Sequence, residues 1–350
     1  MVAPPAPLDH PTHAPPGARY VGSEACATCH RAQAASHRNA GMGHAAERVA
    51  ECRVLESKPS LSFKDGPYAW RIERQGRQSR YTVTDGKETI TVPLAWCFGK
   101  GEAGQTYIFE RGGQLHESRV SYYLDTDALD YTIGAPRAVP ESLEAAAGRR
   151  MASDDARDCF SCHTTASVSG TRLQLERALP GVTCEGCHGP GAEHIEAVKA
   201  RKLSDLRIRP GARGTAEDVS NFCGNCHRTW AAVILQGIRG VANVRFQPYR
   251  LTNSPCYDSE DRRISCLACH DPHESRRRDP ASYDESCQAC HSPKGAAATA
   301  GSRSSKARAC PKGTRLCVEC HMPKYELPGS HFRFTDHWIR VVRAGAPYPD

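Results

Sequence analysis

The chain has 350 residues, of which 39% are hydrophobic and 7% aromatic, with 18 cysteines, 16 histidines and a formal net charge of +7. Such a composition gives a thin apolar core for this length, so metals or cofactors are expected to fill part of the interior. No run approaches the roughly 20 apolar residues of a membrane span. The basic residues are scattered and not interleaved with aromatics, which argues against nucleic-acid binding.

Four parts are predicted in chain order. Residues 1–19 are Pro-rich and are expected to form a flexible tail, and residues 20–52 form a first segment around the first cysteine motif. Residues 53–145 are expected to form a β subdomain, and residues 146–350 a domain with six further cysteine motifs, short helices and long connections. The expected fold class is therefore mainly α and irregular, packed around cofactors, with a small antiparallel β subdomain inserted after the first motif.

The β subdomain is predicted from alternating, β-branched and aromatic runs. Hairpin signals separate several of them: Gln75-Gly76, Asp85-Gly86 and Gly112-Gly113. Four or five strands are expected, over residues 68–73, 79–84, 89–96, 105–110 and 115–123.

Fourteen of the 18 cysteines fall into the pattern Cys-x-x-Cys-His, which occurs seven times. Two thiols at this spacing reach the two vinyl groups of one porphyrin as thioethers, and the following imidazole binds the iron as proximal ligand. A single Cys-x-x-Cys would also fit a zinc site or a redox dithiol, but His follows in every case. Seven haem c groups are therefore expected. In chain order, motifs 1 to 7 are Cys26/Cys29/His30, Cys159/Cys162/His163, Cys184/Cys187/His188, Cys223/Cys226/His227, Cys266/Cys269/His270, Cys287/Cys290/His291 and Cys317/Cys320/His321.

The motifs also indicate the compartment. Covalent haem attachment takes place outside the cytoplasm, so a periplasmic or extracellular location is expected. No charged-then-apolar leader opens the sequence, and an export signal is expected to have been removed. One or two disulfides suit such an oxidising compartment, but the sequence leaves the pairing open among Cys52, Cys97, Cys256 and Cys310.

The second axial ligand of each iron must come from elsewhere. Nine histidines lie outside the motifs, and His10 and His13 belong to the tail, where they are expected to be solvated. The other seven equal the expected irons in number. His194 and His273 end compact turns after motifs 3 and 5, and Pro272 restricts the second turn, which favours ligation. The aromatic surroundings of His331 and His337 favour ligation as well.

Three histidines are more ambiguous. His37 and His44 follow motif 1, and Met42 between them could instead give a His/Met haem of raised potential. His116 lies in a strand-like hairpin, where an exposed strand histidine explains it equally well.

Several segments resemble a family of exported multihaem cytochromes, many of which carry tetratricopeptide repeats after the haem region. They are Tyr20-Val21-Gly22-Ser23-Glu24-Ala25-Cys26, Gly41-Met42-Gly43, residues 181–191, 267–273 and 320–324, and Phe334-Thr335-Asp336-His337, so the likeness runs from about residue 20 to 342. More remotely, the chain is similar to the superfamily of hydroxylamine oxidoreductase, octahaem tetrathionate reductase and pentahaem nitrite reductase. That likeness implies distal ligands at His194, His273 and His337, and closely stacked haem pairs. The repeats and the Cys-x-x-Cys-Lys motif of the nitrite reductase active site are absent from this sequence.

Two functions of different classes follow. The first is electron transfer through mostly bis-His haems, between a membrane quinol oxidase or a terminal reductase and other cytochromes. The second is a reductase or oxidase of a small nitrogen or sulfur compound at one five-coordinate haem, which requires that His37, His44 or His116 is not a ligand. No catalytic residue can be named from the sequence. An oligomer or extracellular haem filament is a further alternative.

Overall fold

The computed structural model describes residues 10–292, 310–343 and 345–350. Residues 1–9 of the expected tail lie outside this range. The chain divides into two compact units. The first consists of the residues up to Arg209 together with Pro328–Phe332, and the second of Pro210–Leu327 and Arg333–Asp350. Motifs 1 to 3 therefore lie in the first unit and motifs 4 to 7 in the second.

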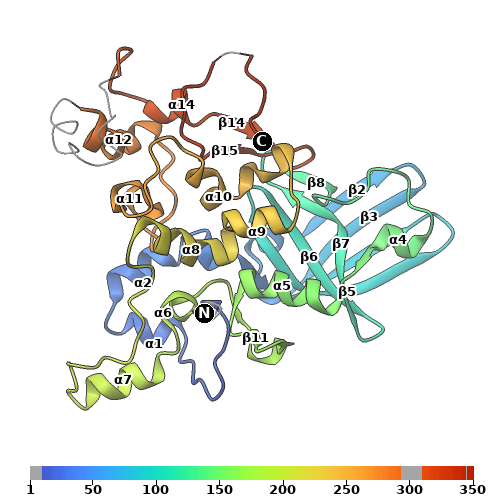
Figure 1. The fold of residues 1–350 in the computed structure, drawn as a ribbon. Helices are drawn as coiled ribbons and strands as arrows, with labels where there is room; N and C mark the ends of the chain where they lie inside the picture. Colours follow the sequence, from blue (N-terminus) through green and yellow to red (C-terminus); the bar gives the residue numbers. More distant parts are fainter. Residues whose placement is uncertain (1–9, 293–309, 344) are drawn as a thin grey trace, which may run out of the picture. The chain divides into compact units, whose positions relative to one another are not determined.

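A large antiparallel sheet dominates the first unit (Figure 1). Seven strands follow one another in the sheet in chain order, from β2 to β8, while β1 pairs with β5 and β9 pairs with β7. The strands are β1 (Ala46–Arg48), β2 (Ser60–Asp65), β3 (Tyr68–Gln75), β4 (Gln78–Thr84), β5 (Thr89–Gly101), β6 (Gly104–Arg111), β7 (Gln114–Tyr123), β8 (Ala128–Tyr131) and β9 (Gly148–Arg150).

The sheet curls until β2 and β8, the first and last of these seven consecutive strands, lie beside each other. It therefore forms a nearly closed barrel. The ring of Phe63 on β2 contacts that of Tyr131 on β8 edge to face at 5.4 Å. The Tyr131 hydroxyl donates a hydrogen bond of 2.6 Å to Asp65. Alternate positions of the strands point inward and form the main core, because side chains on a strand alternate between its two faces. Its largest fully buried members include Trp70, Tyr81, Tyr107, Phe109 and Tyr122.

The predicted fold class is wrong, because a small β subdomain was expected and a nine-stranded sheet is found. The five predicted runs and three hairpins are confirmed as β3 to β7 and their turns. The sequence analysis missed four strands of this sheet, β1, β2, β8 and β9. β1, β8 and β9 have only three or four residues, too few for an alternating pattern to be recognised.

The first unit also contains short helices. The helices are α1 (Ser23–Ala27), α2 (Arg31–His37), α3 (Arg53–Ser57), α4 (Leu143–Ala147), α5 (Ser153–His163), α6 (Cys184–His188) and α7 (Ala192–Lys199). Single 3-10 turns lie at η1 (Met42–His44), η2 (Val49–Glu51) and η3 (Leu175–Arg177). There are also two small two-stranded sheets. One pairs β10 (Thr164–Thr165) with β13 (Leu179–Pro180), and the other pairs β11 (Val168–Ser169) with β12 (Arg172–Leu173). Helix α4 joins the core, because its Ala146 and Ala147 carbonyls accept hydrogen bonds from the buried side chains of Trp70 and Tyr81.

The second unit consists mostly of short helices. They are α8 (Ala216–His227), α9 (Trp230–Leu235), α10 (Gln247–Thr252), α11 (Cys266–Cys269), α12 (Asp284–His291) and α14 (Cys317–His321), with 3-10 turns at η4 (Gly240–Arg245), η5 (Arg262–Ile264) and η6 (Pro280–Tyr283), and one hairpin of β14 (Lys324–Glu326) and β15 (Arg333–Thr335). The buried apolar cluster found among its described residues is small, with Val233, Phe246 and Tyr249. Within the described ranges, every helix is too short or too polar to cross a bilayer.

Candidate haem sites

All seven Cys-x-x-Cys-His motifs contain or border a helical turn. Helices α1, α5, α6, α8, α11, α12 and α14 carry motifs 1 to 7 in this order. Residues three and four apart share one face of a helix, so such a turn directs both thiols and the imidazole toward one side. None of the 14 motif cysteines takes part in a disulfide, and each is at least partly exposed. This donor set fits covalently attached haem, with the two thiols as attachment points and the histidine as iron ligand.

Motifs 1 and 3 lie against each other although their sequences are far apart. The first thiols of the two motifs, Cys26 and Cys184, are in hydrogen-bonding contact. Glu185, inside motif 3 and only 1% exposed, accepts backbone N–H groups from Val21 and Gly22 just before motif 1, at 2.9 and 2.8 Å. It also accepts the Gly191 N–H at 2.8 Å. The Glu185 carboxylate thereby ties the two motifs together.

A close backbone approach reinforces this contact. The Val182 N–H donates to the Met42 carbonyl at 2.9 Å, so the segment after motif 1 runs beside the segment before motif 3. Gly181 has φ +72, and a Cβ there would lie 2.2 Å from the Gly43 carbonyl oxygen. Only glycine fits this position without moving the backbone.

The second unit brings its four motifs together in a similar way. The first thiols of motifs 4 and 5, Cys223 and Cys266, are in hydrogen-bonding contact, and so are those of motifs 6 and 7, Cys287 and Cys317. Asp284 at the start of α12 accepts the backbone N–H groups of Leu316 and Cys317 at 2.8 and 2.9 Å. This carboxylate fixes the beginning of α14 beside motif 6.

The second thiols of the motifs are less uniform than the repeated spacing suggests. Cys29 of motif 1 and Cys320 of motif 7 are exposed, whereas Cys290 of motif 6 is partly exposed. Cys29 lies beyond the end of α1 at Ala27, because that helix has only five residues. The other second thiols are partly exposed as well: Cys162, Cys187, Cys226 and Cys269. Exposure depends on how the motifs pack in space, so seven identical spacings cannot reveal this difference.

The hydrogen-bonding contacts between motifs described above join first thiols, and no second thiol is among them. Cys290 lies instead near Cys256, outside the motifs; burial raises the pKa of Cys256, and Cys290 adds to this effect. Haem attachment at all fourteen motif cysteines, Cys29, Cys290 and Cys320 included, therefore stays a prediction that rests on the Cys-x-x-Cys-His spacing.

His194 on α7 faces the histidine of motif 1. The ring centroids of His30 and His194 are 6.4 Å apart, with an interplanar angle of 27°. Two imidazoles bound to opposite sides of one metal ion, at about 2 Å from each nitrogen, hold their ring centres roughly 6 Å apart. The Nδ1 of His194 bonds the Leu206 carbonyl at 2.8 Å, which orients its Nε2 for a metal.

A second pair of the same kind occurs in the other unit. The ring centroids of His270 in motif 5 and His337 are 6.2 Å apart, with an interplanar angle of 38°. The Nδ1 of His337 bonds the Thr335 carbonyl at 3.0 Å. Burial, with the nearby His270 as a smaller cause, lowers the pKa of His337 to about 4. The ring is therefore neutral near pH 7, which is the form that binds metals.

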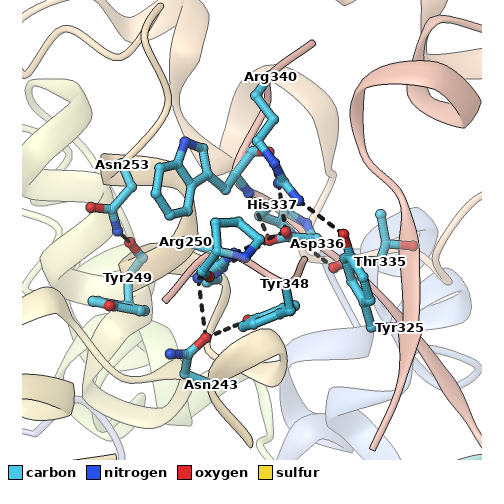
Figure 2. A network of polar contacts seen from close by, with 12 residues as sticks. Asn243, Tyr249, Arg250, Asn253, Tyr325, Thr335, Asp336, His337, Arg340 and Tyr348 are labelled. Carbon is cyan, nitrogen blue, oxygen red and sulfur yellow. Dashed lines mark hydrogen bonds and ion pairs between the residues drawn. The ribbon is translucent and has the colours of Figure 1, made fainter. Parts of the chain in front are cut away.

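A buried ionic network holds the residue next to His337 (Figure 2). Arg250 and Asp336 are both fully buried, and the guanidinium makes two bonds of 2.8 and 3.0 Å to the carboxylate. Arg340 adds a bond of 2.6 Å to Asp336, while its carbonyl accepts a hydrogen bond of 2.9 Å from Nδ1 of His321 in motif 7. The network thus connects His337, opposite motif 5, with the histidine of motif 7.

Two other motif histidines are anchored by backbone carbonyls. Nδ1 of His163 bonds the Ala45 carbonyl at 2.7 Å, and Nδ1 of His188 bonds the Arg209 carbonyl at 2.9 Å. Such a bond fixes the tautomer and the ring orientation of a metal-binding histidine. The histidines of motifs 4 and 6 are the last residues of α8 and α12: His227 and His291.

Two predicted distal ligands, His44 and His331, form hydrogen bonds to the protein through their ring nitrogens. Both ring nitrogens of His44 are hydrogen bonded, Nδ1 to Glu47 at 3.0 Å and Nε2 to the Arg38 carbonyl at 2.6 Å. Nε2 of His331 bonds Asp130 at 2.7 Å. Each of these residues would have to break such a contact before its Nε2 could bind iron.

The remaining candidates lie in different surroundings. His37 and Cys184 line one cavity of about 140 Å³, so His37 lies near motif 3. His116 stacks on Phe109 within the sheet, at 5.2 Å between centroids. Nδ1 of His273 bonds the Asp271 carboxylate at 3.0 Å. Met42 belongs to the turn η1.

One histidine dismissed by the sequence analysis lies at a motif. His10 Nε2 is 3.9 Å from the Cys162 sulfur of motif 2, and its Nδ1 is 2.8 Å from the Thr12 hydroxyl. Thr12 and Ala14 are buried, and Ala14 N–H bonds the Val168 carbonyl. The part of the expected tail that the structure describes therefore packs beside motif 2. The Pro-rich composition gave no signal of this packing.

Comparisons with known proteins agree with these motifs. The family described as Cytochrome c554 and c-prime matches residues 116–189, which contain motifs 2 and 3. Over 209 residues the chain is 22% identical to the Multiheme cytochrome MtrA of Shewanella baltica (strain OS185), a match that covers 53% of this chain. The chain spans about 60% of the length of that curated relative. No solved structure is significantly similar to the chain.

Proposed function

We propose that this chain, a multihaem c-type cytochrome, carries seven haem c groups and transfers electrons among them outside the cytoplasm. The observation that carries the proposal is the contact between first thiols of different motifs: Cys26 with Cys184, Cys223 with Cys266, and Cys287 with Cys317. Each thiol is the attachment point of one macrocycle, so a thiol contact brings the edges of two macrocycles together. Adjacent macrocycles are what one-electron transfer along a protein requires.

The axial ligands are part of the same proposal. The spacing of the His30 and His194 rings, and of the His270 and His337 rings, supports His194 as distal ligand to the iron of motif 1 and His337 to that of motif 5. Two strong axial ligands leave no open position on the iron, and such a haem carries electrons and does not bind substrate. The expected redox partners are a membrane quinol oxidase, a terminal reductase or other cytochromes.

A redox titration of the haem-loaded protein tests the function. One-electron mediators should reduce and reoxidise all seven haems reversibly, and another cytochrome should accept the electrons. The same protein, reduced, should leave nitrite, hydroxylamine and tetrathionate unchanged. Fast consumption of one of these compounds would instead show an enzyme.

One observation favours a second candidate, a reductase or oxidase of a small nitrogen or sulfur compound. Seven distal histidines for seven irons, as predicted, would have to include His44 and His331. Both ring nitrogens of His44 and Nε2 of His331 are occupied by hydrogen bonds to the protein. If these bonds persist beside bound haem, an iron can keep an open coordination position. A high-spin ferric signal that changes on adding nitrite or hydroxylamine would support this candidate.

A further inference from the structure

Two cysteines outside the haem motifs lie side by side in the core of the first unit. Cys52 and Cys97 are both 0% exposed and belong to the same buried apolar cluster. Their thiols are in hydrogen-bonding contact with each other. Cys52 follows the turn η2 at the end of the segment 20–52 around motif 1, whereas Cys97 lies on β5 of the sheet. The contact therefore joins two different parts of the fold.

The surrounding structure fixes both positions. Cys97 is the register partner of Glu47 on β1 and of Tyr107 on β6, so strands border it on both sides. The Cys52 sulfur lies 3.2 Å from the amide oxygen of buried Gln105, which also belongs to β6. Cys52 is thus held against the strand next to the one that carries Cys97.

A metal site does not explain this pair. Structural zinc sites need four ligands, drawn from cysteine, histidine and carboxylate side chains. Among the residues that the structure describes, no third side chain of these types brings its ligand atom within bonding range of one ion together with Cys52 and Cys97. Two buried thiols in contact, in an oxidising compartment, are instead suited to a covalent bond.

We propose that Cys52 and Cys97 are joined by a disulfide in the mature protein, which fastens the segment after motif 1 to the sheet. The oxidant is a protein disulfide of the extracytoplasmic thiol-oxidation machinery. One cysteine thiolate attacks that disulfide and forms a mixed disulfide with it, and the second cysteine then displaces the oxidant. One S–S bond forms, two S–H bonds are lost, and the oxidant leaves as a dithiol carrying the two electrons and two protons.

Burial determines when this exchange can take place. Both sulfurs lie in the core of the folded first unit. Because both sulfurs are buried in the folded chain, the exchange must take place before the sheet closes over them.

The bond would support the arrangement around motif 2. The Ala45 carbonyl, just before β1, accepts the Gly99 N–H at 2.8 Å and also anchors Nδ1 of His163. A disulfide between Cys52 and Cys97 would join the chain after β1 to the part of β5 that leads to Gly99. It would therefore hold together the two segments that carry Ala45 and Gly99. A disulfide that closes a loop of this kind stabilises mainly by restricting the unfolded chain.

Peptide mapping of the haem-loaded protein tests the proposal. The protein is denatured with an alkylating reagent present, without reductant, and digested with trypsin. Residues 49–53 and 88–100 should appear as one linked species that separates on reduction. Both peptides carrying an alkyl group at Cys52 and Cys97 before reduction would overturn the proposal. The proposal rests on the extracytoplasmic location, but attached haem in the same sample verifies that location independently.

A stability measurement gives a second readout. Reductant should lower the thermal unfolding midpoint of the first unit on the order of 5 °C in the wild type. The same treatment should leave the C52S/C97S double variant unchanged and should act on the Cys256→Ser control as on the wild type. An equal response of the wild type and the double variant to reductant would argue against the bond.

Discussion

The imidazole rings of His30 and His194 face each other with 6.4 Å between their centroids, although one belongs to motif 1 and the other lies on α7 after motif 3. The contact between motifs 1 and 3 brings the two rings together. The pairing of the rings yields the first prediction. In His194→Ala the haem of motif 1 should stay attached, because its thioethers are intact, while its ferric iron should change from low spin to high spin. Electron paramagnetic resonance measures this change.

His44→Ala is the matched control for that experiment. Both ring nitrogens of His44 are bound to protein atoms, so its loss should leave the number of low-spin haems unchanged. A high-spin haem in the His44 variant and none in the His194 variant would reverse the assignment.

The Glu185 carboxylate gives a prediction about folding. Glu185→Gln replaces one of two acceptor oxygens by a donor, so at least one of the three backbone N–H groups that the carboxylate accepts loses its partner. Hydrogen bonds to charged groups contribute about 1.5–3 kcal/mol each, so the free energy of unfolding should fall by about 3 kcal/mol. Denaturant unfolding measures it. Glu196→Gln removes an exposed ion pair with Arg19 and should cost less than about 1 kcal/mol. Equal effects of the two changes would contradict this role of Glu185.

The sequence predicted the hairpins better than the contacts between distant segments. The hairpin at Asp85-Gly86 has a local signal, because a few adjacent residues determine the turn. The contact of Gly181 with the Gly43 carbonyl has none, since it depends on segments more than a hundred residues apart. The engagement of His331 by Asp130 is equally non-local, and a count of histidines cannot reveal it.

The buried pair of Arg250 and Asp336 gives the third prediction. Arg250→Met removes a positively charged partner of the fully buried Asp336 carboxylate. The free energy of unfolding should therefore fall by about 3 kcal/mol or more. The spectrum and potential of the haem opposite His337 should shift as well, because Asp336 holds the neighbouring backbone. Arg71→Met, which removes an exposed ion pair with Glu73, serves as control and should change neither quantity appreciably. A spectrum identical to that of the wild type in Arg250→Met would show that the network does not position His337.

The same carboxylate predicts a pH dependence. Burial acts to raise the pKa of Asp336, but hydrogen bonds from Arg250, Trp338 and Arg340 outweigh it and hold the pKa below the usual 3.8. A depressed carboxyl pKa contributes stability that is complete above the unfolded-state value and is lost as the pH falls through the folded-state value. The stability difference between wild type and Asp336→Asn should therefore be constant above about pH 5 and shrink progressively below pH 3.8. Denaturant unfolding across this range measures it, and a difference that grows on acidification would contradict the assignment.

The central claim is a set of seven haems whose irons mostly carry two histidine ligands. Haem quantification together with electron paramagnetic resonance of the fully oxidised protein tests it most directly. The account predicts seven haems per chain and predominantly low-spin ferric signals, with those of motifs 1 and 5 always low spin. Fewer haems than motifs, or a high-spin signal from motif 1 or motif 5 in the wild type, would contradict it.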